Sequence, residues 1–218
     1  MTDIARLIDH TLLRPDATPR QIERLCGESV EHGFATVCVN SCHVPVCRKL
    51  VGTGPVGVCA VVGFPLGAGL REAKAYEAGT AVALGADEID MVMNIGWLKS
   101  GVDELVVSDI SRVVQAVPGR PVKVIIETCL LTEDEKERAT GLVVRAGARF
   151  VKTSTGFSSG GATVEDVALL ARVANGRIGV KASGGIRDLV TACRMVAAGA
   201  TRIGTSSGVA IVAEESGR

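Results

Sequence analysis

The sequence predicts an α/β fold, a (β/α)8 (TIM) barrel that forms a single domain over residues 1–218. Eight short apolar segments alternate with segments of helical periodicity, which is typical of repeated βα units. The joins from helix to strand are short and carry glycine at 33, 85, 147, 176 and 199, where a left-handed helix cap is expected. Several joins from strand to helix are long and polar. A doubly wound open sheet is the alternative, but it usually has fewer units than eight.

The first strand is expected at 8–13, where Arg14 and Pro15 end it. Thr18, Pro19 and Gln21 then form the start of a helix with a capping box, and that helix runs to about residue 32. The other strands are expected at 35–40, 56–62, 88–94, 121–128, 150–153, 178–182 and 202–204, and the other helices at about 43–50, 70–84, 102–117, 132–146, 163–174, 186–198 and near Ser207.

The charges of the chain balance, with 24 basic and 24 acidic side chains. A chain without net charge has no global field that would draw it onto nucleic acid or a membrane, so neither partner is expected. An anionic ligand would have to be held by local groups.

Several features favour the cytoplasm. No apolar run approaches the roughly 20 residues of a membrane span, and the first nine residues are too charged for a signal peptide. The chain has seven cysteines, an odd number, without a paired CxxC pattern. Reduced thiols are therefore expected, and no disulfide framework.

In a barrel of this kind the active site lies at the carboxyl ends of the strands. Candidates are therefore the polar residues late in each strand or just after it. They are Asp9, Thr11, Cys38, Asn40, Asp90, Asn94, Glu127, Lys152, Thr153, Thr155, Lys181, Ser183, Ser206 and Ser207.

Lys152 and Lys181 each lie in a short apolar strand, where an unpaired ammonium would be costly. Two converging lysines oppose each other's protonation, so the pKa of at least one should fall and yield an amine that attacks a carbonyl as a Schiff-base nucleophile. Asp90 could hold one amine charged and move protons through a water. The alternative is a set of structural ion pairs with Asp90, Asp87 or Glu127. Lys123, early in its strand, is expected to serve ionic packing.

The three last strand-to-helix loops combine glycine with hydroxyl groups before a helix: 155–161, 183–187 and 204–208. Free backbone N–H groups and a helix dipole would form an anion site there, although the glycines could also serve turns alone. A metal site is not expected, because Cys38, Cys42, His43 and Cys47 match no ligand spacing. Cys38 also has no histidine base that would make it a nucleophile.

Four motifs resemble the deoxyribose-phosphate aldolase family: VKTSTGF at 151–157, VKASGGIR at 180–187, DEIDMV at 87–92 and IDHTLL at 8–13. The resemblance runs in order from about residue 8 to residue 208. It implies that Lys152 forms the Schiff base, that Lys181 favours the neutral form of its neighbour, and that Asp90 serves a proton relay. It further implies phosphate contacts from Gly184, Gly185, Gly204, Ser206 and Ser207, with Gly156 nearby, and sugar contacts from Thr11 and Thr155.

The implied reaction is the reversible cleavage of 2-deoxy-D-ribose 5-phosphate to D-glyceraldehyde 3-phosphate and acetaldehyde, without a metal or cofactor, by a homodimer. Two positions depart from the family pattern. Phe157 stands where some members have a phosphate-binding lysine, and the only tyrosine is Tyr76, whereas some members protonate the enamine with a C-terminal tyrosine. Two rivals stay open: an isomerase or synthase that uses Asp90 and Glu127 as acid and base, and a non-catalytic barrel that binds a sugar phosphate.

Overall fold

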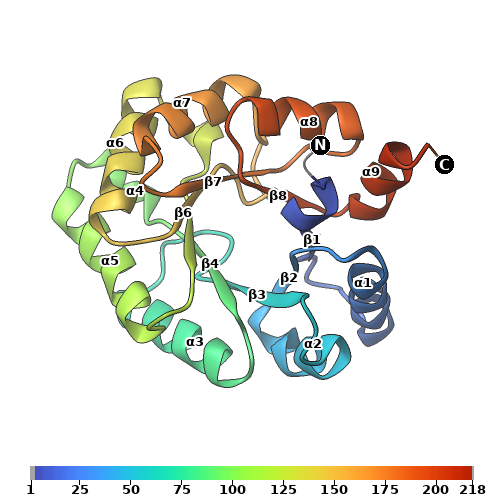
Figure 1. The fold of residues 1–218 in the computed structure, drawn as a ribbon. Coiled ribbons are helices and arrows are strands. Elements are labelled where there is room, and N and C mark those ends of the chain that lie inside the picture. Colours follow the sequence, from blue (N-terminus) through green and yellow to red (C-terminus); the bar gives the residue numbers. More distant parts are fainter. Residues whose placement is uncertain (1–2, 218) are drawn as a thin grey trace.

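Each strand pairs in parallel with its neighbours in the sequence, and the last strand pairs with the first, so the sheet closes into a barrel surrounded by helices (Figure 1). The computed structural model describes residues 3–217. The predicted (β/α)8 barrel is therefore confirmed. Closure leaves no free sheet edge and brings all eight carboxyl ends to one face.

The strands are short. They are β1 (Ile8–Leu12), β2 (Thr36–Asn40), β3 (Gly57–Val62), β4 (Glu88–Val92), β5 (Val122–Ile125), β6 (Phe150–Lys152), β7 (Gly179–Ser183) and β8 (Arg202–Thr205). The helices are α1 (Pro19–His32), α2 (Val44–Val51), α3 (Arg71–Ala83), α4 (Ile95–Lys99), α5 (Asp103–Ala116), α6 (Glu133–Arg145), α7 (Val164–Ala174), α8 (Leu189–Ala197) and α9 (Gly208–Glu215). Short 3-10 helices occupy Ile4–Leu7, Ser41–His43 and Thr128–Leu130.

Local capping explains where the predicted helices begin and end. The glycines expected at the helix ends, 33, 85, 147, 176 and 199, all have positive φ values. In the predicted second capping box, the Thr132 N–H donates to Glu135 at 2.9 Å and the Glu135 N–H donates back to the Thr132 hydroxyl at 3.3 Å.

Among the details that differ from the sequence-based expectation, three have a clear local cause. Helix α4 was not expected; its five residues begin where the Asn94 side chain accepts from the Trp97 N–H at 3.1 Å. Strand β5 ends at Ile125 rather than 128, because Glu127 adopts a left-handed conformation with φ 54°. Helix α8 begins at Leu189 rather than 186, because Asp188 caps it by accepting from the Thr191 N–H at 2.7 Å.

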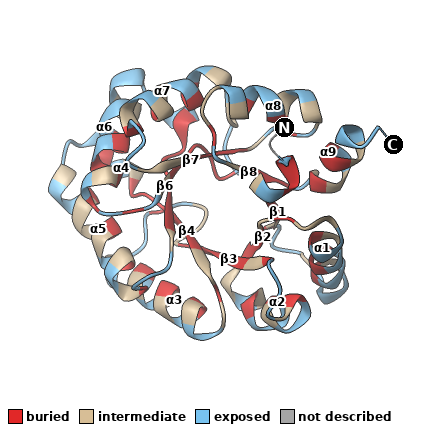
Figure 2. Cartoon of the chain, viewed as in Figure 1, coloured by how far each residue is buried: buried red, intermediate tan, exposed pale blue. Residues whose placement is uncertain are grey.

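The two faces of the sheet differ in polarity. Outward residues such as Val37, Val58 and Ile89 are fully buried against the helices and belong to one large apolar core (Figure 2). Inward residues include Asp9, Asp90 and several lysines, which are equally buried but charged. The strands therefore hold a polar centre inside an apolar shell.

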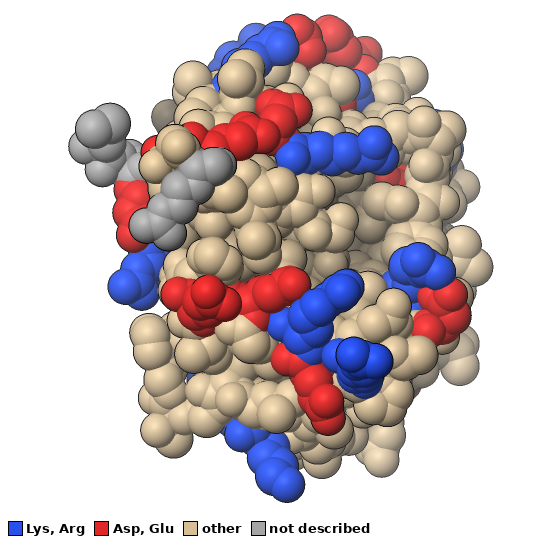
Figure 3. Space-filling model, turned by 90° about the vertical axis from the view of Figure 1, so that its right-hand side faces the viewer, with Lys and Arg blue, Asp and Glu red and all other residues tan. Residues whose placement is uncertain are grey.

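Charged residues of both signs are interspersed on the face seen in Figure 3, as the balanced composition suggests. Within residues 3–217, none of the helices combines the length and the apolarity that crossing a membrane would need. The seven cysteines are all free thiols, which agrees with the expectation that no disulfide framework is present.

A buried ion pair lies outside the barrel, between α3 and α5. Lys74 Nζ is 2.6 Å from Asp109 Oδ2 and donates to the Val92 carbonyl at 3.0 Å, and both charged side chains are 1% exposed. The Lys74→Met substitution leaves the Asp109 carboxylate buried without its cation. We expect the free energy of unfolding to fall by about 3–5 kcal/mol, measured by urea denaturation.

The double variant Lys74→Met/Asp109→Leu should recover most of that loss, because both charges are then removed together. As a matched control, Lys99→Met breaks the surface pair with Glu135, in which Lys99 is 45% exposed, and should cost less than about 1 kcal/mol. Equal losses of unfolding free energy in Lys74→Met and Lys99→Met would contradict the prediction that breaking the buried ion pair costs more than breaking the exposed one.

Candidate active site

A cavity of about 420 Å³ opens at the carboxyl ends of the strands. The residues predicted for the site that line this cavity are Thr11, Lys152, Thr155, Gly156, Ser183, Gly184, Gly185, Gly204 and Ser206. Ser207 does not; it precedes α9, and its N–H donates to the Thr205 hydroxyl at 2.9 Å. Lys181 and Asp90 are also not part of the wall, because both are fully buried beneath it. The cavity therefore exposes one of the two predicted lysines.

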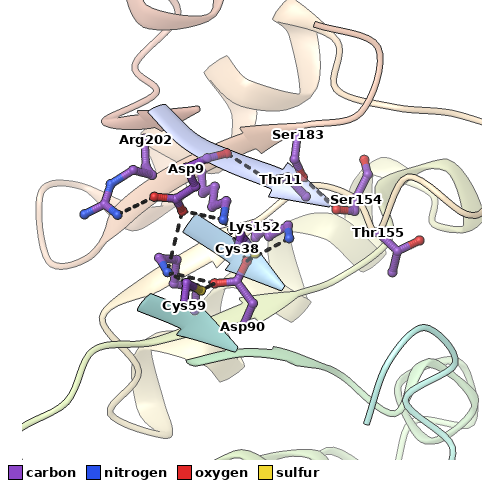
Figure 4. A network of polar contacts seen from close by, with 12 residues as sticks. Asp9, Thr11, Cys38, Cys59, Asp90, Lys152, Ser154, Thr155, Ser183 and Arg202 are labelled. Carbon is purple, nitrogen blue, oxygen red and sulfur yellow. Dashed lines mark hydrogen bonds and ion pairs between the residues drawn. The ribbon is translucent and has the colours of Figure 1, made fainter. Parts of the chain in front are cut away.

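Asp90 is the centre of the charged cluster below the cavity (Figure 4). Its Oδ2 accepts from Lys152 Nζ at 2.8 Å and from Lys181 Nζ at 2.7 Å, and its Oδ1 accepts from Lys123 Nζ at 2.8 Å. Lys152 and Lys181 are register partners on β6 and β7, as Asp90 and Lys123 are on β4 and β5. Parallel pairing thus places these groups at one level of the barrel.

Asp9 forms the second half of this cluster. Its Oδ2 lies 2.5 Å from Lys181 Nζ, and its Oδ1 accepts from Arg202 at 2.7 Å. Arg202 and Lys123 also contact Glu88, at 2.9 and 2.6 Å. Asp9 was one of many sequence candidates without an assigned role, and Arg202 was not one of them. The structure shows that Lys181 is held by two carboxylates, not by Asp90 alone.

These contacts set the directions of the pKa shifts. Burial favours the neutral form of Asp90, but Lys123, Lys152 and Lys181 outweigh it and hold the pKa of Asp90 well below its usual range. Burial likewise disfavours charge on Lys181, but Asp9 and Asp90 outweigh it and raise the pKa of Lys181. The sequence-based expectation was that the pKa of at least one of the two lysines falls; Lys181 is not that lysine, because Asp9, which was not considered as its partner, adds a second negative charge beside it. The pKa of Lys123 is raised in the same way, burial being outweighed chiefly by Asp90.

The cluster contains more cations than anions. Three carboxylates, Asp9, Glu88 and Asp90, contact four cationic side chains, Lys123, Lys152, Lys181 and Arg202. Lys152 differs from the other three cations because it contacts one carboxylate, whereas each of the others contacts at least two. Removing a proton from Lys152 therefore disrupts the fewest ion pairs and leaves the cluster neutral. The amine whose deprotonation disrupts the fewest ion pairs is thus Lys152, the one that faces the cavity.

Gly204 has a packing role that the sequence did not reveal. A Cβ at this position would lie 2.9 Å from Lys181 Cε and 3.0 Å from Ser183 Cβ. The bare backbone of β8 thus leaves room for the Lys181 side chain to reach Asp9 and Asp90.

Two arginines also line the cavity: Arg187, which follows Gly184 and Gly185 in the sequence, and Arg14, which pairs with Asp16. Both glycines have positive φ values, 87° and 82°, so the loop follows a course that other residues rarely take. Sequence reasoning did not assign a role to either arginine, although Arg187 directly follows the Gly184-Gly185-Ile186 segment. Guanidinium groups are well suited to bind a phosphate, so this part of the cavity can hold an anion.

The helix ends near this loop are not equivalent. Thr163 caps α7 by accepting from the Asp166 N–H, and Asp188 places its own carboxylate at the start of α8. An anion at the start of α8 would meet that negative charge. The start of α9 has no side-chain cap. Of the three loops in which an anion site was expected, the one before α9 offers an uncapped helix terminus.

Phe157 lines the cavity and packs edge-on against Phe64, with ring centroids 5.2 Å apart. It adds apolar surface at the position where, by the family resemblance, some members have a phosphate-binding lysine. Tyr76 is 78% exposed on α3 and does not line the cavity. Its position gives no support for a role in proton transfer.

Cys38 and Cys59 are register partners on β2 and β3, and their sulfur atoms lie within 4.8 Å of each other and of an Asp90 oxygen. This is a different group from the cysteines and histidine considered in the sequence. Asp90 already accepts from three ammonium groups, and Lys123 Nζ is 3.3 Å from Cys59 Sγ. A metal cation would have to enter among these positive charges, so the group does not fit a metal site.

Comparisons with known proteins agree with this geometry. Residues 4–214 match the family model of the DeoC/LacD family aldolases. A deoxyribose-phosphate aldolase of Geobacillus sp. (strain WCH70) is 58% identical over 211 residues, covering 96% of this chain and 95% of the relative. The solved structure of QR15, an aldolase, has a TM-score of 0.96 at 44% identity and covers 100% of this chain and 98% of its own.

A deoxyribose phosphate aldolase from Aeropyrum pernix, whose solved structure is described as a unique tetramer, has a TM-score of 0.87 at 36% identity. The match covers 99% of this chain and 92% of that one. With a family model that spans almost the whole sequence and a relative of 58% identity over nearly its full length, the chain belongs to the DeoC/LacD aldolase family.

Proposed function

We propose that the chain is a class I aldolase that reversibly cleaves 2-deoxy-D-ribose 5-phosphate to D-glyceraldehyde 3-phosphate and acetaldehyde. The observation that carries this proposal is Lys152, a lysine at the cavity wall with one carboxylate partner, above a cluster with one excess cation. The names of the relatives support the substrate. Borohydride trapping with acetaldehyde tests the chemistry, because reduction of an imine leaves an ethyl group on the reacting lysine.

In the cleavage direction, Lys152 Nζ attacks C1 of the open-chain sugar, and loss of water gives a protonated imine. A base removes the proton of the C3 hydroxyl as the C2–C3 bond breaks. The electron pair of that bond passes to the iminium nitrogen, so D-glyceraldehyde 3-phosphate leaves and an enamine remains. Protonation at C2 and hydrolysis then release acetaldehyde and restore the amine. The protonated imine is the electron sink, so this mechanism requires no metal or cofactor.

The fixed charges around Lys152 support each half of this cycle. Lys181 remains charged because Asp9 and Asp90 raise its pKa. This permanent cation and Lys152 donate to the same oxygen of Asp90. Because Lys181 shares this oxygen with Lys152, the Asp90 carboxylate keeps a counter-charge when Lys152 reacts as a neutral amine. Asp90 in turn can stabilise the iminium and pass a proton through a bound water.

Arg187 supplies a test of the phosphate end. In Arg187→Ala, we expect the KM for 2-deoxy-D-ribose 5-phosphate to rise about tenfold to hundredfold, because a charge-assisted hydrogen bond contributes about 1.5–3 kcal/mol. The steady-state rate with unphosphorylated 2-deoxy-D-ribose should change little. The control is Arg177→Ala, which removes an arginine that donates to the last two carbonyls of α7, those of Val173 and Ala174. Equal effects on both substrates would argue against phosphate binding by Arg187.

We also propose a homo-oligomer in the cytoplasm, with the dimer as the simplest form. Leu66, Leu70 and Tyr76 are each more than 70% exposed and lie on α3 or in the loop before it, which supports a subunit contact there. Three of the seven free thiols, Cys42, Cys129 and Cys193, are exposed, which supports a reducing compartment. Light scattering at several concentrations tests the subunit contact, and Leu70→Glu should shift the mass towards the monomer.

A further inference from the structure

Glu127 is a buried carboxylate without an ion pair. Five carboxylate side chains are buried within residues 3–217: Asp9, Asp90, Asp109, Glu127 and Asp166. Four of them contact a lysine or arginine within 4.0 Å, whereas Glu127, at 3% exposure, contacts none in the part of the chain that is described. Burying a carboxylate in this way is costly unless hydrogen bonds satisfy its oxygens.

Thr155, at the cavity wall, supplies those hydrogen bonds. Its N–H donates to Glu127 Oε1 at 3.2 Å, and its hydroxyl donates to Oε2. The same hydroxyl accepts from the Phe157 N–H at 3.0 Å. A hydroxyl has one proton to donate and two lone pairs to accept with. Thr155 therefore presents a single lone pair to the cavity and no proton.

The backbone on either side of Glu127 is tied to the strand that carries Lys152. The Ile126 N–H donates to the Lys152 carbonyl at 3.0 Å, and the Thr128 N–H donates to the Thr153 carbonyl at 2.9 Å. Between them Glu127 has φ 54° and ψ 69°, a conformation that is uncommon for residues other than glycine. Glycine would adopt this turn more readily, so the turn itself does not require a carboxylate.

Resting on the function proposed above, we propose that Glu127 is a positioning residue that orients the Thr155 hydroxyl to accept a hydrogen bond from a sugar hydroxyl beyond C2. A sugar hydroxyl can donate a hydrogen bond to the remaining lone pair of the Thr155 hydroxyl. A carbonyl or ether oxygen at that point has no proton to donate, so its lone pairs would repel that of Thr155. Thr11, on the cavity wall, has the same polarity, since its hydroxyl donates to the Asp9 carbonyl at 2.8 Å. The Thr11 hydroxyl donates to a backbone carbonyl, whereas the Thr155 hydroxyl donates to the Glu127 side chain. A substitution of Glu127 can therefore change which way the Thr155 hydroxyl points its proton.

The contact matters for only part of the reaction. Acetaldehyde carries no hydroxyl, so its imine with Lys152 forms without help from Thr155. 2-Deoxy-D-ribose 5-phosphate has hydroxyl groups on the carbons beyond C2, and these need the oriented acceptor. Loss of the Glu127 carboxylate should therefore separate the two substrates.

The test is Glu127→Gln, which keeps the size of the side chain but places an amide N–H2 where Thr155 now donates. We expect kcat/KM for 2-deoxy-D-ribose 5-phosphate to fall about tenfold to hundredfold, the cost of misplacing a substrate group. The rate of borohydride trapping with acetaldehyde should stay within about twofold of wild type, which also shows that the variant is folded. Glu137→Gln, the same change at an exposed position on α6, is the matched control.

A second variant links the effect to Thr155. Thr155→Val should lower kcat/KM to a similar extent, and Glu127→Gln/Thr155→Val should be no worse than Thr155→Val alone, because both changes remove one contact. Additive losses, or equal losses of cleavage and acetaldehyde trapping, would overturn the proposal and assign Glu127 to the support of β6. Unchanged cleavage in Glu127→Gln would overturn it as well. A wild-type protein that neither cleaves the sugar phosphate nor traps acetaldehyde would refute the proposed function instead.

Discussion

The Lys152→Ala variant should lose the ethyl adduct that borohydride fixes after incubation with acetaldehyde, and its kcat/KM for 2-deoxy-D-ribose 5-phosphate should fall by about 10³-fold or more. The reason is that no other amine can take over. Lys181 and Lys123 are fully buried and each is held by at least two carboxylates. Mass spectrometry of the intact and digested protein measures both the extent and the position of the adduct.

The control is Lys99→Ala, which removes a half-exposed amine on α4 and should leave trapping and turnover unchanged. Undiminished activity of Lys152→Ala would refute the assignment of the nucleophile. Turnover that survives borohydride in the wild-type protein would instead favour an isomerase or synthase with acid–base chemistry at Asp90 and Glu127. Binding of the sugar phosphate without any turnover would favour a non-catalytic barrel.

The Asp90→Asn variant should be affected both in activity and in stability. Three ammonium groups donate to Asp90 in the folded protein, and an amide of the same shape cannot balance their charge. Removing one partner from a buried ionic cluster typically costs about 3–5 kcal/mol of unfolding free energy, so we expect a loss of that size near neutral pH. Turnover should fall about 10³-fold or more, because the remaining charges no longer fix the position of Lys152.

The pH dependence of stability between pH 7 and 9 should differ between this variant and the wild-type protein. In the wild-type protein, carboxylates raise the pKa of Lys181 and Lys123, so their stabilisation is complete below the unfolded value and is lost only at strongly alkaline pH. Without Asp90, the buried amines lose a counter-charge and favour the neutral form. The unfolded state then binds more protons, so the unfolding free energy should rise from pH 7 to 9.

Urea denaturation across this pH range measures the effect, with Asp16→Asn as a control at an exposed aspartate of the surface pair with Arg14. A stability profile parallel to that of wild type would show that Asp90 is not the counter-charge of the lysines. Loss of stability without loss of activity in Asp90→Asn would show that Asp90 has a structural role and no role in the reaction.

The periodicity of the sequence predicted most of the fold, because alternating apolar segments and glycine caps depend on neighbouring residues. Helix α4 was missed, since five residues are too few for a helical repeat to be visible. The early end of β5 was also missed, because it depends on the positive φ of Glu127, which a glutamate rarely adopts.

The cavity-lining residues were found largely from motifs and from their places at strand ends, but their partners were not. Asp9 and Arg202 contact each other across 193 positions of sequence, and no local pattern reports such a pair. The direction of the Lys181 pKa depended on that missing carboxylate. Charge balance inside a barrel is a property of the closed sheet, so it could be worked out only once the register of all eight strands was known.

The excess cation of the inner cluster has a consequence for the reaction itself. In the proposed reaction, the ammonium form of Lys152 and the protonated imine formed at its nitrogen carry the same charge next to the same Asp90 oxygen. On this proposal, the protein with Lys152 in its ammonium form is an electrostatic mimic of the imine intermediate. The surrounding dipoles and charges need not reorganise when the intermediate forms, and such preorganisation is a major source of catalytic power in buried sites. In the proposed reaction, the ion pairs of the barrel interior would therefore also stabilise the covalent species.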